Sequence, residues 1–210
     1  MLQYRPYYHR HLPHYQPPGC TLFVTFRLAG FLSKAILDSL LAQQRVTERV
    51  LERIADPNER DRVAYAEHRR LFGAWDDALD AESAGPRWLE DAGVADLVAD
   101  CRYHRDGRTY NLHAFCIMPN HVHLVCTPLE EREGEFHSLA AILHSLKLYT
   151  AREANKLLGR RGSFWQHESY DHVVRDGDEF SRIVTYVLNN PVKAGLTVMW
   201  EDWRWAYSSE

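Results

Sequence analysis

The order of apolar and polar residues predicts strands at three places along the chain. Residues 19–28 (GCTLFVTFRL) follow a Pro-Pro-Gly turn and are rich in aromatic and β-branched side chains, which is typical of a strand. Residues 110–127 (YNLHAFCIMPNHVHLVCT) predict two strands around the Met-Pro-Asn segment at 118–120, most simply as a hairpin. One more strand is expected within residues 162–175.

Helical spacing of apolar residues dominates the remaining segments. Over residues 33–81 the pattern is interrupted once, at Asp56-Pro57-Asn58, so two helices are expected there. A third helix follows Gly85-Pro86, because the apolar residues from Val94 to Cys101 form an i, i+3, i+4, i+7 stripe. Further helices are predicted at residues 139–158 and 178–188.

Length and composition favour a single soluble domain spanning residues 1–210. A chain of 210 residues can bury one substantial core, and its hydrophobic content of 45% is close to the globular average. No apolar run is long enough to cross a membrane, and the polar, aromatic N-terminus does not resemble a signal peptide. We therefore expect a cytoplasmic protein without membrane contact. The four cysteines form no CxxC pair and are expected to be reduced thiols.

The net charge of −4 argues weakly against a nucleic-acid partner until it is divided along the chain. Residues 31–100 carry 15 acidic and 9 basic side chains, which leaves 14 acidic and 16 basic side chains for the rest. Within that remainder, residues 147–161 hold five basic side chains against Glu153 alone. This segment is therefore a local basic patch on a predicted helix.

Two histidines at alternate positions of a predicted strand are the main candidates for chemistry. In His121-Val122-His123 both imidazoles should lie on one face of the strand, with Val122 on the other. Two neutral imidazoles on a rigid face can hold a divalent cation and leave positions open for another side chain, water and a substrate phosphate. By itself the triplet is a weak signal, because most such pairs are ordinary polar or half-buried histidines.

Longer motifs around this triplet strengthen the signal. The chain resembles the HUH-type single-tyrosine transposases, and specifically their REP-associated tyrosine transposase branch in bacteria. The resemblance runs through LPHYQPPG, FVTFRL, CIMPNHVHLV, GSFWQHESYDHVVRD and YVLNNPVKAGL. It covers about the first thirty residues and the stretch from about Arg102 onward, so the helical segment at about 33–100 is expected to be an insertion.

The resemblance implies both a fold and a reaction. The fold would be α+β, with a ferredoxin-like or RRM-like antiparallel sheet of four to five strands and helices on one face. His121 and His123 would bind the metal from a central strand, and Tyr186 would be the nucleophile that forms a covalent 5′-phosphotyrosine and releases a 3′-hydroxyl. A phenol with a pKa of about 10 needs a nearby cation to react at neutral pH, which agrees with the histidine pair.

Asn190 is the candidate third metal ligand, because it follows Tyr186 by four residues and would share its helix face. The best-known relatives carry a glutamine there. Pro191 should also end the helix, because the residue before a proline avoids helical geometry, so Asn190 could instead cap the helix or touch DNA. One amide and two imidazoles with open positions suit Mg²⁺ or Mn²⁺, whereas zinc could bind without supporting turnover.

Three further residues compete for roles at this site. Tyr149 and Tyr170 could replace Tyr186 as the nucleophile, although Tyr149 is equally a core or DNA-stacking residue and Tyr170 a strand residue packed beside Trp165. His113 could approach the metal from the neighbouring strand, or serve as a core or substrate-positioning residue. Tyr186 is the preferred nucleophile.

Basic and aromatic residues predict where single-stranded DNA with hairpins or palindromic repeats would bind. A basic stripe at i, i+4 and i+8 of the predicted helix lies close in sequence to a Phe-Trp pair, which favours phosphate contacts with base stacking on exposed rings. A solvated helix face is the alternative. In the family the N-terminal stretch helps to recognise the hairpin. The expected DNA contacts are Arg5, Arg10, Lys147, Arg152, Lys156, Arg160, Arg161, Trp165 and Lys193.

Two other functions are compatible with the sequence. A hairpin-binding protein would keep the DNA surface with little or no cleavage, and a metal-dependent hydrolase would use water in place of the tyrosine. Self-mobilisation cannot be assumed, because family members of this branch often occur as single genes associated with repeated palindromes. The helical segment could thicken the core, make a dimer contact or restrict DNA access, and the chain could be a monomer, which the resemblance favours, or a homodimer.

Overall fold

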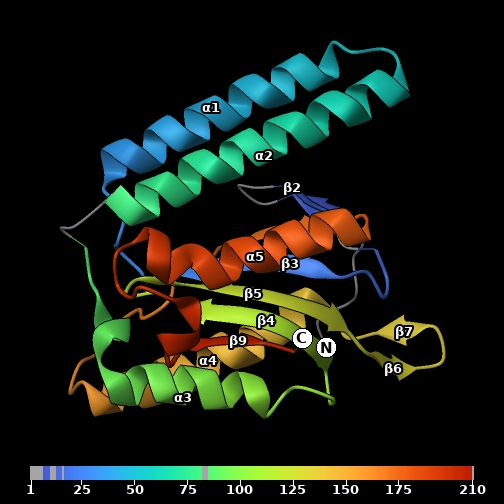
Figure 1. Ribbon diagram of the computed structural model, residues 1–210. Helices are drawn as coiled ribbons and strands as arrows, with labels where there is room; N and C mark the ends of the chain where they lie inside the picture. The colour runs from blue at the N-terminus through green and yellow to red at the C-terminus, as the bar shows by residue number, and fades with distance from the viewer. Residues whose placement is uncertain (1–6, 10–12, 16, 82–84, 210) are drawn as a thin grey trace. The chain divides into compact units, whose positions relative to one another are not determined.

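A five-stranded antiparallel sheet forms the core of the fold. The computed structural model describes residues 7–9, 13–15, 17–81 and 85–209. The strands lie in the order β8-β3-β5-β4-β9, so that β5 is the central strand (Figure 1). Their bounds are β3 (Leu22–Arg27), β4 (Tyr110–Ile117), β5 (His121–Pro128), β8 (Tyr170–Val173) and β9 (Ala206–Ser208). The predicted α+β fold with an antiparallel sheet of four to five strands is confirmed, and β4 and β5 form the expected hairpin.

Several short elements, β9 among them, have no counterpart in the prediction from sequence. β1 (Tyr7–His9) pairs with β2 (Pro13–Tyr15), and β6 (Glu130–Arg132) pairs with β7 (Glu135–Phe136). Two single turns of 3₁₀ helix are also present, η1 (Trp88–Glu90) and η2 (Trp200–Asp202). Elements of two or three residues are too short to show a period of apolar residues.

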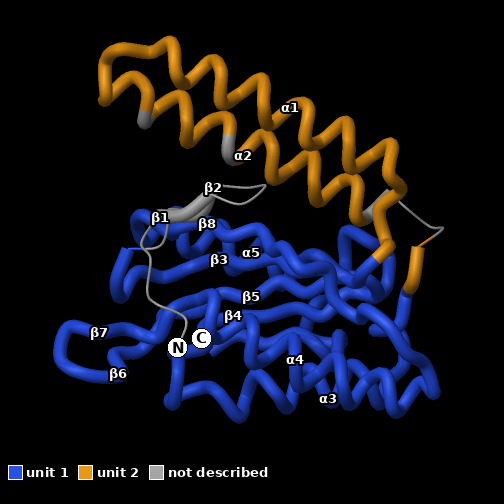
Figure 2. Tube along the Cα trace, turned by 180° about the vertical axis from the view of Figure 1, so that it is seen from behind, with its two compact units in different colours: residues 1–29, 87–210 blue, residues 30–86 orange. Residues whose placement is uncertain are grey.

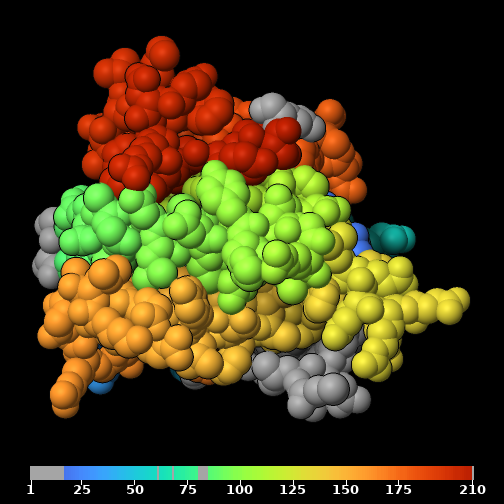
Figure 3. Space-filling view, turned by 90° about the horizontal axis from the view of Figure 1, so that it is seen from below, coloured from blue at the N-terminus to red at the C-terminus, as the bar shows by residue number. Residues whose placement is uncertain are grey.

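Different helices bury the two faces of the sheet. α3 (Ala92–Tyr103) and α4 (Leu139–Leu157) pack side by side on the face that carries Val24 and Leu124 (Figure 3). α5 (Gly177–Lys193) packs against β4 and β5 on the opposite face (Figure 1). The expectation of helices on one face alone is therefore wrong. Buried residues alternate to both sides of β3 and β5, and each side requires its own cover.

Each of these three helices begins at a capping residue. The side chains of Asp91, Ser138 and Asp176 each accept a hydrogen bond from the backbone N–H three residues further on. Such a cap satisfies one of the free N–H groups of the first helical turn. The short-range sequence therefore fixes where α3, α4 and α5 begin.

The C-terminal segment ties the edge of the sheet to α3. The indole N–H of Trp203 donates to the carbonyl oxygen of Ile117 at 3.0 Å. The indole N–H of Trp205 and the guanidinium of Arg204 both donate to the carboxylate of Asp96, at 2.9 and 2.7 Å. These bonds hold the chain that follows α5 along α3 (Figure 3).

Residues 30–86 form a second compact unit, a hairpin of two long helices (Figure 2). α1 (Lys34–Glu52) begins at the capping side chain of Ser33, and α2 (Pro57–Ala81) begins at the predicted proline break. The core of the hairpin contains Phe31, Leu32, Leu40 and Leu79. Helix α3, which lies within the segment at about 33–100 that was expected to be inserted, packs into the core of the first unit, residues 1–29 and 87–210.

All four cysteines are free thiols, as the sequence predicted. Burial raises the pKa of Cys126 to about 12, so its thiol stays protonated and unreactive at neutral pH. Among the helices of the described residues, none combines the length and the apolar character needed to cross a membrane.

Candidate functional site

His121 and His123 lie side by side on the central strand, as their alternation predicts. Both are fully buried, on the face of β5 opposite Val122. Their ring centroids are 4.6 Å apart, and the two Nε2 atoms face each other at 3.0 Å. The pairing of β5 with β3 places His123 opposite Thr25 and His121 opposite Arg27.

Each imidazole is oriented by a hydrogen bond at its other nitrogen. Nδ1 of His121 lies 2.6 Å from Oδ1 of Asn120, and Nδ1 of His123 lies 2.8 Å from Oγ1 of Thr25. Histidines that bind metals in proteins are usually held in this way, with one nitrogen on an oxygen partner and the other directed to the ion.

The spacing of the two Nε2 atoms fits a divalent cation. An ion about 2.1 Å from each of two nitrogens at right angles requires those nitrogens to lie about 3 Å apart, and the observed separation is 3.0 Å. Right angles between ligands are the geometry of octahedral Mg²⁺. The residues present therefore fit such an ion.

Helix α5 brings Tyr186 to the histidine pair. The tyrosine ring lies 5.6 Å from the ring of His123 and 6.1 Å from that of Phe23, measured between centroids. Its hydroxyl oxygen is buried. The residues of the candidate nucleophile and of the candidate metal ligands, distant in sequence, thus meet on one face of the sheet.

The predicted end of this helix is wrong, because α5 runs through Pro191 to Lys193. A proline inside a helix removes one hydrogen bond and costs about 3 kcal/mol. Burial of the apolar residues Val187, Leu188 and Pro191 in the last turns compensates for that cost. Ala194 is the residue that caps the helix, so Asn190 does not cap it.

Asn190 occupies the helix face of Tyr186, one turn further on. Its side chain is buried, and neither its Oδ1 nor its Nδ2 has a hydrogen-bond partner among the residues that the structure describes. A buried amide in this state costs about 1–3 kcal/mol unless something satisfies it. A metal ion coordinated by Oδ1 would supply such a partner.

Arg27 adds positive charge to the same face. It is the cross-strand neighbour of His121, and its side chain points to the histidine side because Thr25 does so two residues earlier. Burial lowers the pKa of Arg27 to about 10, and the nearby Glu168 opposes that change. The guanidinium therefore stays charged at neutral pH.

The competing residues are placed less favourably than Tyr186. Tyr149 lies half exposed on α4, which covers the other face of the sheet. Tyr170 pairs with Thr25 across β3 and β8, and its ring lies 6.4 Å from that of Phe23, whereas the ring of Tyr186 lies 5.6 Å from that of His123 itself. His113 is hydrogen-bonded to Thr127 at 2.8 Å through Nε2, so that nitrogen is already engaged.

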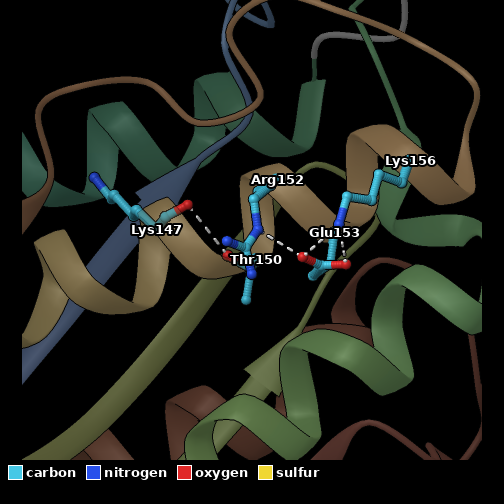
Figure 4. Close-up of polar contacts among 5 residues, drawn as sticks. All are labelled: Lys147, Thr150, Arg152, Glu153 and Lys156. Atoms are coloured by element: carbon cyan, nitrogen blue, oxygen red, sulfur yellow. Dashed lines mark hydrogen bonds and ion pairs between the residues drawn. The ribbon is translucent and has the colours of Figure 1, made fainter.

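The basic stripe of α4 is shorter than predicted. Arg152 and Lys156 are exposed, and both are paired with Glu153, at 2.6 and 3.0 Å (Figure 4). Arg160 lies beyond the end of the helix, where its guanidinium stacks 3.5 Å from the Trp88 ring and donates to the carbonyl oxygen of Ser163. The expected i, i+4, i+8 series therefore ends after Lys156.

Two residues predicted to touch DNA, Lys147 and Trp165, make structural contacts within the chain. Trp165 is buried with Phe164, and its indole N–H donates to the hydroxyl of Thr150 at 2.8 Å, so the expectation of exposed stacking rings is wrong. The ammonium of Lys147 donates to the carbonyl oxygens of Gln166 and His167, which holds the loop before β8. A ring flanked by polar residues in sequence can still belong to the core.

The remaining predicted contacts are Arg161 and Lys193, which are exposed, and Arg5 and Arg10, which lie outside the described residues. Lys193 stands at the C-terminal end of α5, three residues after Asn190. Of the predicted DNA contacts, Lys193 is the one that lies on the same helix as Tyr186.

No protein-family model matches the chain. A putative REP-associated tyrosine transposase of Haemophilus influenzae is 28% identical to it over 101 residues, and the REP-associated tyrosine transposase of Escherichia coli strain K12 is 25% identical over 96 residues. The chain is similar to REP-associated tyrosine transposases. Each match covers 46% of this chain, and the chain spans about half the length of these relatives, 56% and 53%.

A solved structure of a REP-associated tyrosine transposase bound to a REP hairpin has the same fold. It superposes with a TM-score of 0.51, covers 98% of this chain and 82% of that chain, and is 16% identical in sequence. At this identity the likeness concerns the fold alone. The resemblance to REP-associated tyrosine transposases that the sequence motifs indicated is confirmed by these relatives.

The transposase motifs did not identify Thr25, Arg27 and Asn120 as residues of the site. Asn120 directly precedes the histidine pair, and Thr25 and Arg27 lie within the FVTFRL motif. The alternation of that strand places Thr25 and Arg27 on one face. Only the register of β3 against β5 shows that this is the face of the histidines.

Proposed function

We propose that this chain is a metal-dependent, transposase-type enzyme that cleaves and rejoins single-stranded DNA near hairpins. The observation that carries the proposal is the meeting of His121, His123 and Tyr186 on one face of the sheet. Relatives named REP-associated tyrosine transposases support this class of function, and the hairpin bound to one of them supports the class of substrate.

His121, His123 and Asn190 hold the divalent cation, Mg²⁺ or Mn²⁺, in this proposal. The facing Nε2 atoms and the unsatisfied buried amide of Asn190 support this ligand set. The bound cation supplies positive charge, which favours the phenolate form of a tyrosine and polarises a phosphate under attack.

Tyr186 acts as the nucleophile. Its phenolic oxygen attacks the phosphorus of a DNA phosphodiester, the bond from phosphorus to the 3′-oxygen breaks, and the phenolic proton is finally carried by the released 3′-hydroxyl. The 5′-phosphotyrosine preserves the energy of the broken bond, so a second DNA 3′-hydroxyl can reverse the step and join strands without a nucleotide cofactor.

Charged residues around the site bind the DNA backbone. Arg27 lies beside His121 and offers a guanidinium to the scissile phosphate, because a buried cation binds an anionic group strongly. Lys193, at the end of α5, contacts a more distant phosphate. Arg152, Lys156 and Arg161 lie on or just after α4, on the other side of the sheet, and contact DNA that extends beyond the site. Arg5 and Arg10 retain the role in hairpin recognition that the family resemblance implies.

The decisive experiment detects the covalent intermediate. The purified chain is incubated with labelled single-stranded hairpin DNA from its own genomic neighbourhood and with Mg²⁺ or Mn²⁺, and the products are separated by denaturing electrophoresis. We expect an adduct with the wild type and none with Tyr186→Phe or His121→Ala. Tyr149→Phe and Tyr170→Phe are the matched controls, and both should still form the adduct.

The other outcomes separate the alternatives. An adduct that persists in Tyr186→Phe would show that another residue is the nucleophile. Strand cleavage by Tyr186→Phe without any adduct would support a hydrolase that uses water. Tight hairpin binding with neither cut nor adduct, with either metal, would support a DNA-binding protein without cleavage activity.

A further inference from the structure

The histidine pair belongs to a chain of four hydrogen-bonded side chains. Oγ1 of Thr25 lies 2.8 Å from Nδ1 of His123, the two Nε2 atoms are 3.0 Å apart, and Nδ1 of His121 lies 2.6 Å from Oδ1 of Asn120. Each of these three contacts needs one proton between its two atoms. With both rings neutral, the positions of the protons follow from one end of the chain.

Asn120 determines the direction of the hydrogen bonds. Its Oδ1 can only accept, so the proton of that contact is on Nδ1 of His121, and in the neutral ring Nε2 of His121 carries a lone pair. The proton between the rings then belongs to Nε2 of His123. Nδ1 of His123 consequently carries a lone pair and accepts the hydroxyl proton of Thr25. The direction is Thr25 to His123 to His121 to Asn120.

This arrangement makes the two histidines unequal toward a cation. A metal ion requires a lone pair on both Nε2 atoms. His121 already presents one, because Asn120 holds its proton on Nδ1. His123 presents one only after its proton has moved from Nε2 to Nδ1, and Nδ1–H then needs an acceptor in a buried position.

We propose that Thr25 is a positioning residue that permits this change of tautomer, and that Asn120 is a positioning residue that fixes the tautomer of His121. The inference rests on the proposed metal centre. A hydroxyl can donate in one state and, after rotation about its C–O bond, accept in the other, which an amide oxygen cannot do. When a cation binds, Thr25 changes from donor to acceptor, and the pair of rings neither gains nor loses a proton.

The surroundings of Thr25 make the hydroxyl necessary. Thr25 is buried in the middle of β3, and the Phe23 ring lies 5.6 Å from the ring of His123. In such a setting a donor without an acceptor costs about 1–3 kcal/mol. Loss of an outer partner of a metal-binding histidine typically weakens metal binding by about 10- to 100-fold.

The test uses a matched pair of substitutions at one position. Thr25→Val has nearly the same shape and lacks the hydroxyl, whereas Thr25→Ser keeps it. Mn²⁺ affinity is measured by electron paramagnetic resonance, and the histidine tautomers by ¹⁵N NMR, without metal and with Mg²⁺. We expect Thr25→Val to bind Mn²⁺ about 10- to 100-fold more weakly than the wild type and Thr25→Ser to bind it about as well.

The NMR spectra test the direction of the hydrogen bonds. Without metal, His123 should carry its proton on Nε2 and His121 on Nδ1; with Mg²⁺, both protons should be on Nδ1. Equal Mn²⁺ affinity of Thr25→Val and wild type, or a proton already on Nδ1 of His123 without metal, would overturn the role of Thr25 and leave the metal centre intact. A wild-type chain that binds neither ion would overturn the metal centre, and the role of Thr25 with it.

Discussion

Arg102 provides a direct test of the energetics of burial in this fold. Its side chain is fully buried, with the guanidinium carbon 3.9 Å from the centre of the Phe115 ring. None of its guanidinium nitrogens has a hydrogen-bond partner within the described part of the chain. Burial lowers the pKa of Arg102 from an ordinary value of about 12.5 to about 10, and the neighbouring Tyr110 and Cys101 partly oppose this change. The charge therefore destabilises the folded state at neutral pH.

The substitution Arg102→Met removes this charge and keeps a long side chain on the Phe115 ring. At about 1.4 kcal/mol per pKa unit, the lowered pKa corresponds to a folding cost of roughly 3 kcal/mol. The lost contact between cation and ring cancels about 2 kcal/mol of the gain, and a methionine sulfur on the ring recovers part of that. We expect the free energy of unfolding to rise by about 1 kcal/mol and Tm by about 2–4 °C.

Urea unfolding followed by tryptophan fluorescence measures this difference. Arg105→Met is the matched control, because Arg105 donates to the carbonyl oxygen and the sulfur of Cys101 and to the hydroxyl of Ser145. Its loss should lower the free energy of unfolding by about 1–2 kcal/mol. If Arg102→Met instead destabilises the chain by more than about 1 kcal/mol, the reasoning on the unpaired guanidinium is refuted.

The pH dependence of the stability difference between wild type and Arg102→Met tests whether the buried charge causes that difference. The pKa of Arg102 is lower in the folded chain than in the unfolded chain, so above about pH 10 the unfolded chain binds more protons. The free energy of unfolding of the wild type should therefore rise, relative to Arg102→Met, as the pH increases from about 10. The advantage of the variant should be complete below about pH 10 and decrease above it. An advantage that is constant with pH would point to packing as its source.

Two further predictions concern the helical hairpin and α4. Gly85→Ala should lower the free energy of unfolding by about 1–3 kcal/mol, because a Cβ at this position would lie 2.6 Å from a backbone oxygen. Gly73→Ala, in the interior of α2, should raise it by about 1 kcal/mol, because a Cβ there would have nothing within 4 Å. Urea unfolding of the two variants measures both changes. Glu153→Gln removes the negative charge shared by Arg152 and Lys156, so single-stranded DNA should bind more tightly and the plot of log affinity against log salt should steepen by about 0.7 per added phosphate contact. Unchanged DNA affinity in a fluorescence-anisotropy titration would show that α4 does not contact the DNA.

Local sequence predicted most of the regular structure. The alternation in residues 19–28 and 110–127, the helical periods and the proline break at residue 57 all correspond to elements of the fold. The same alternation placed His121 and His123 side by side, because successive residues of a strand always point to opposite faces. These features depend on contacts between residues close in the sequence, which a pattern can encode.

Tertiary contacts overrode local preference at two positions. Pro191 predicted the end of a helix, yet burial of the final turns of α5 keeps the helix intact to Lys193. Trp165, which lies close to Arg160 and Arg161 in sequence, is buried because its indole N–H donates to Thr150 and its ring packs against Phe26. Local preference is worth a few kcal/mol at most, and burial can exceed it.

The sequence by itself determined that two imidazoles share one strand face, and its motifs named Tyr186 as their partner. The tertiary structure decided what surrounds them. The register of β3 against β5 brings Thr25 and Arg27 to the histidines, and the packing of α5 on the sheet brings Tyr186 to His123. Strand register and helix docking depend on the summed burial of many residues far apart along the chain, so no local pattern records them.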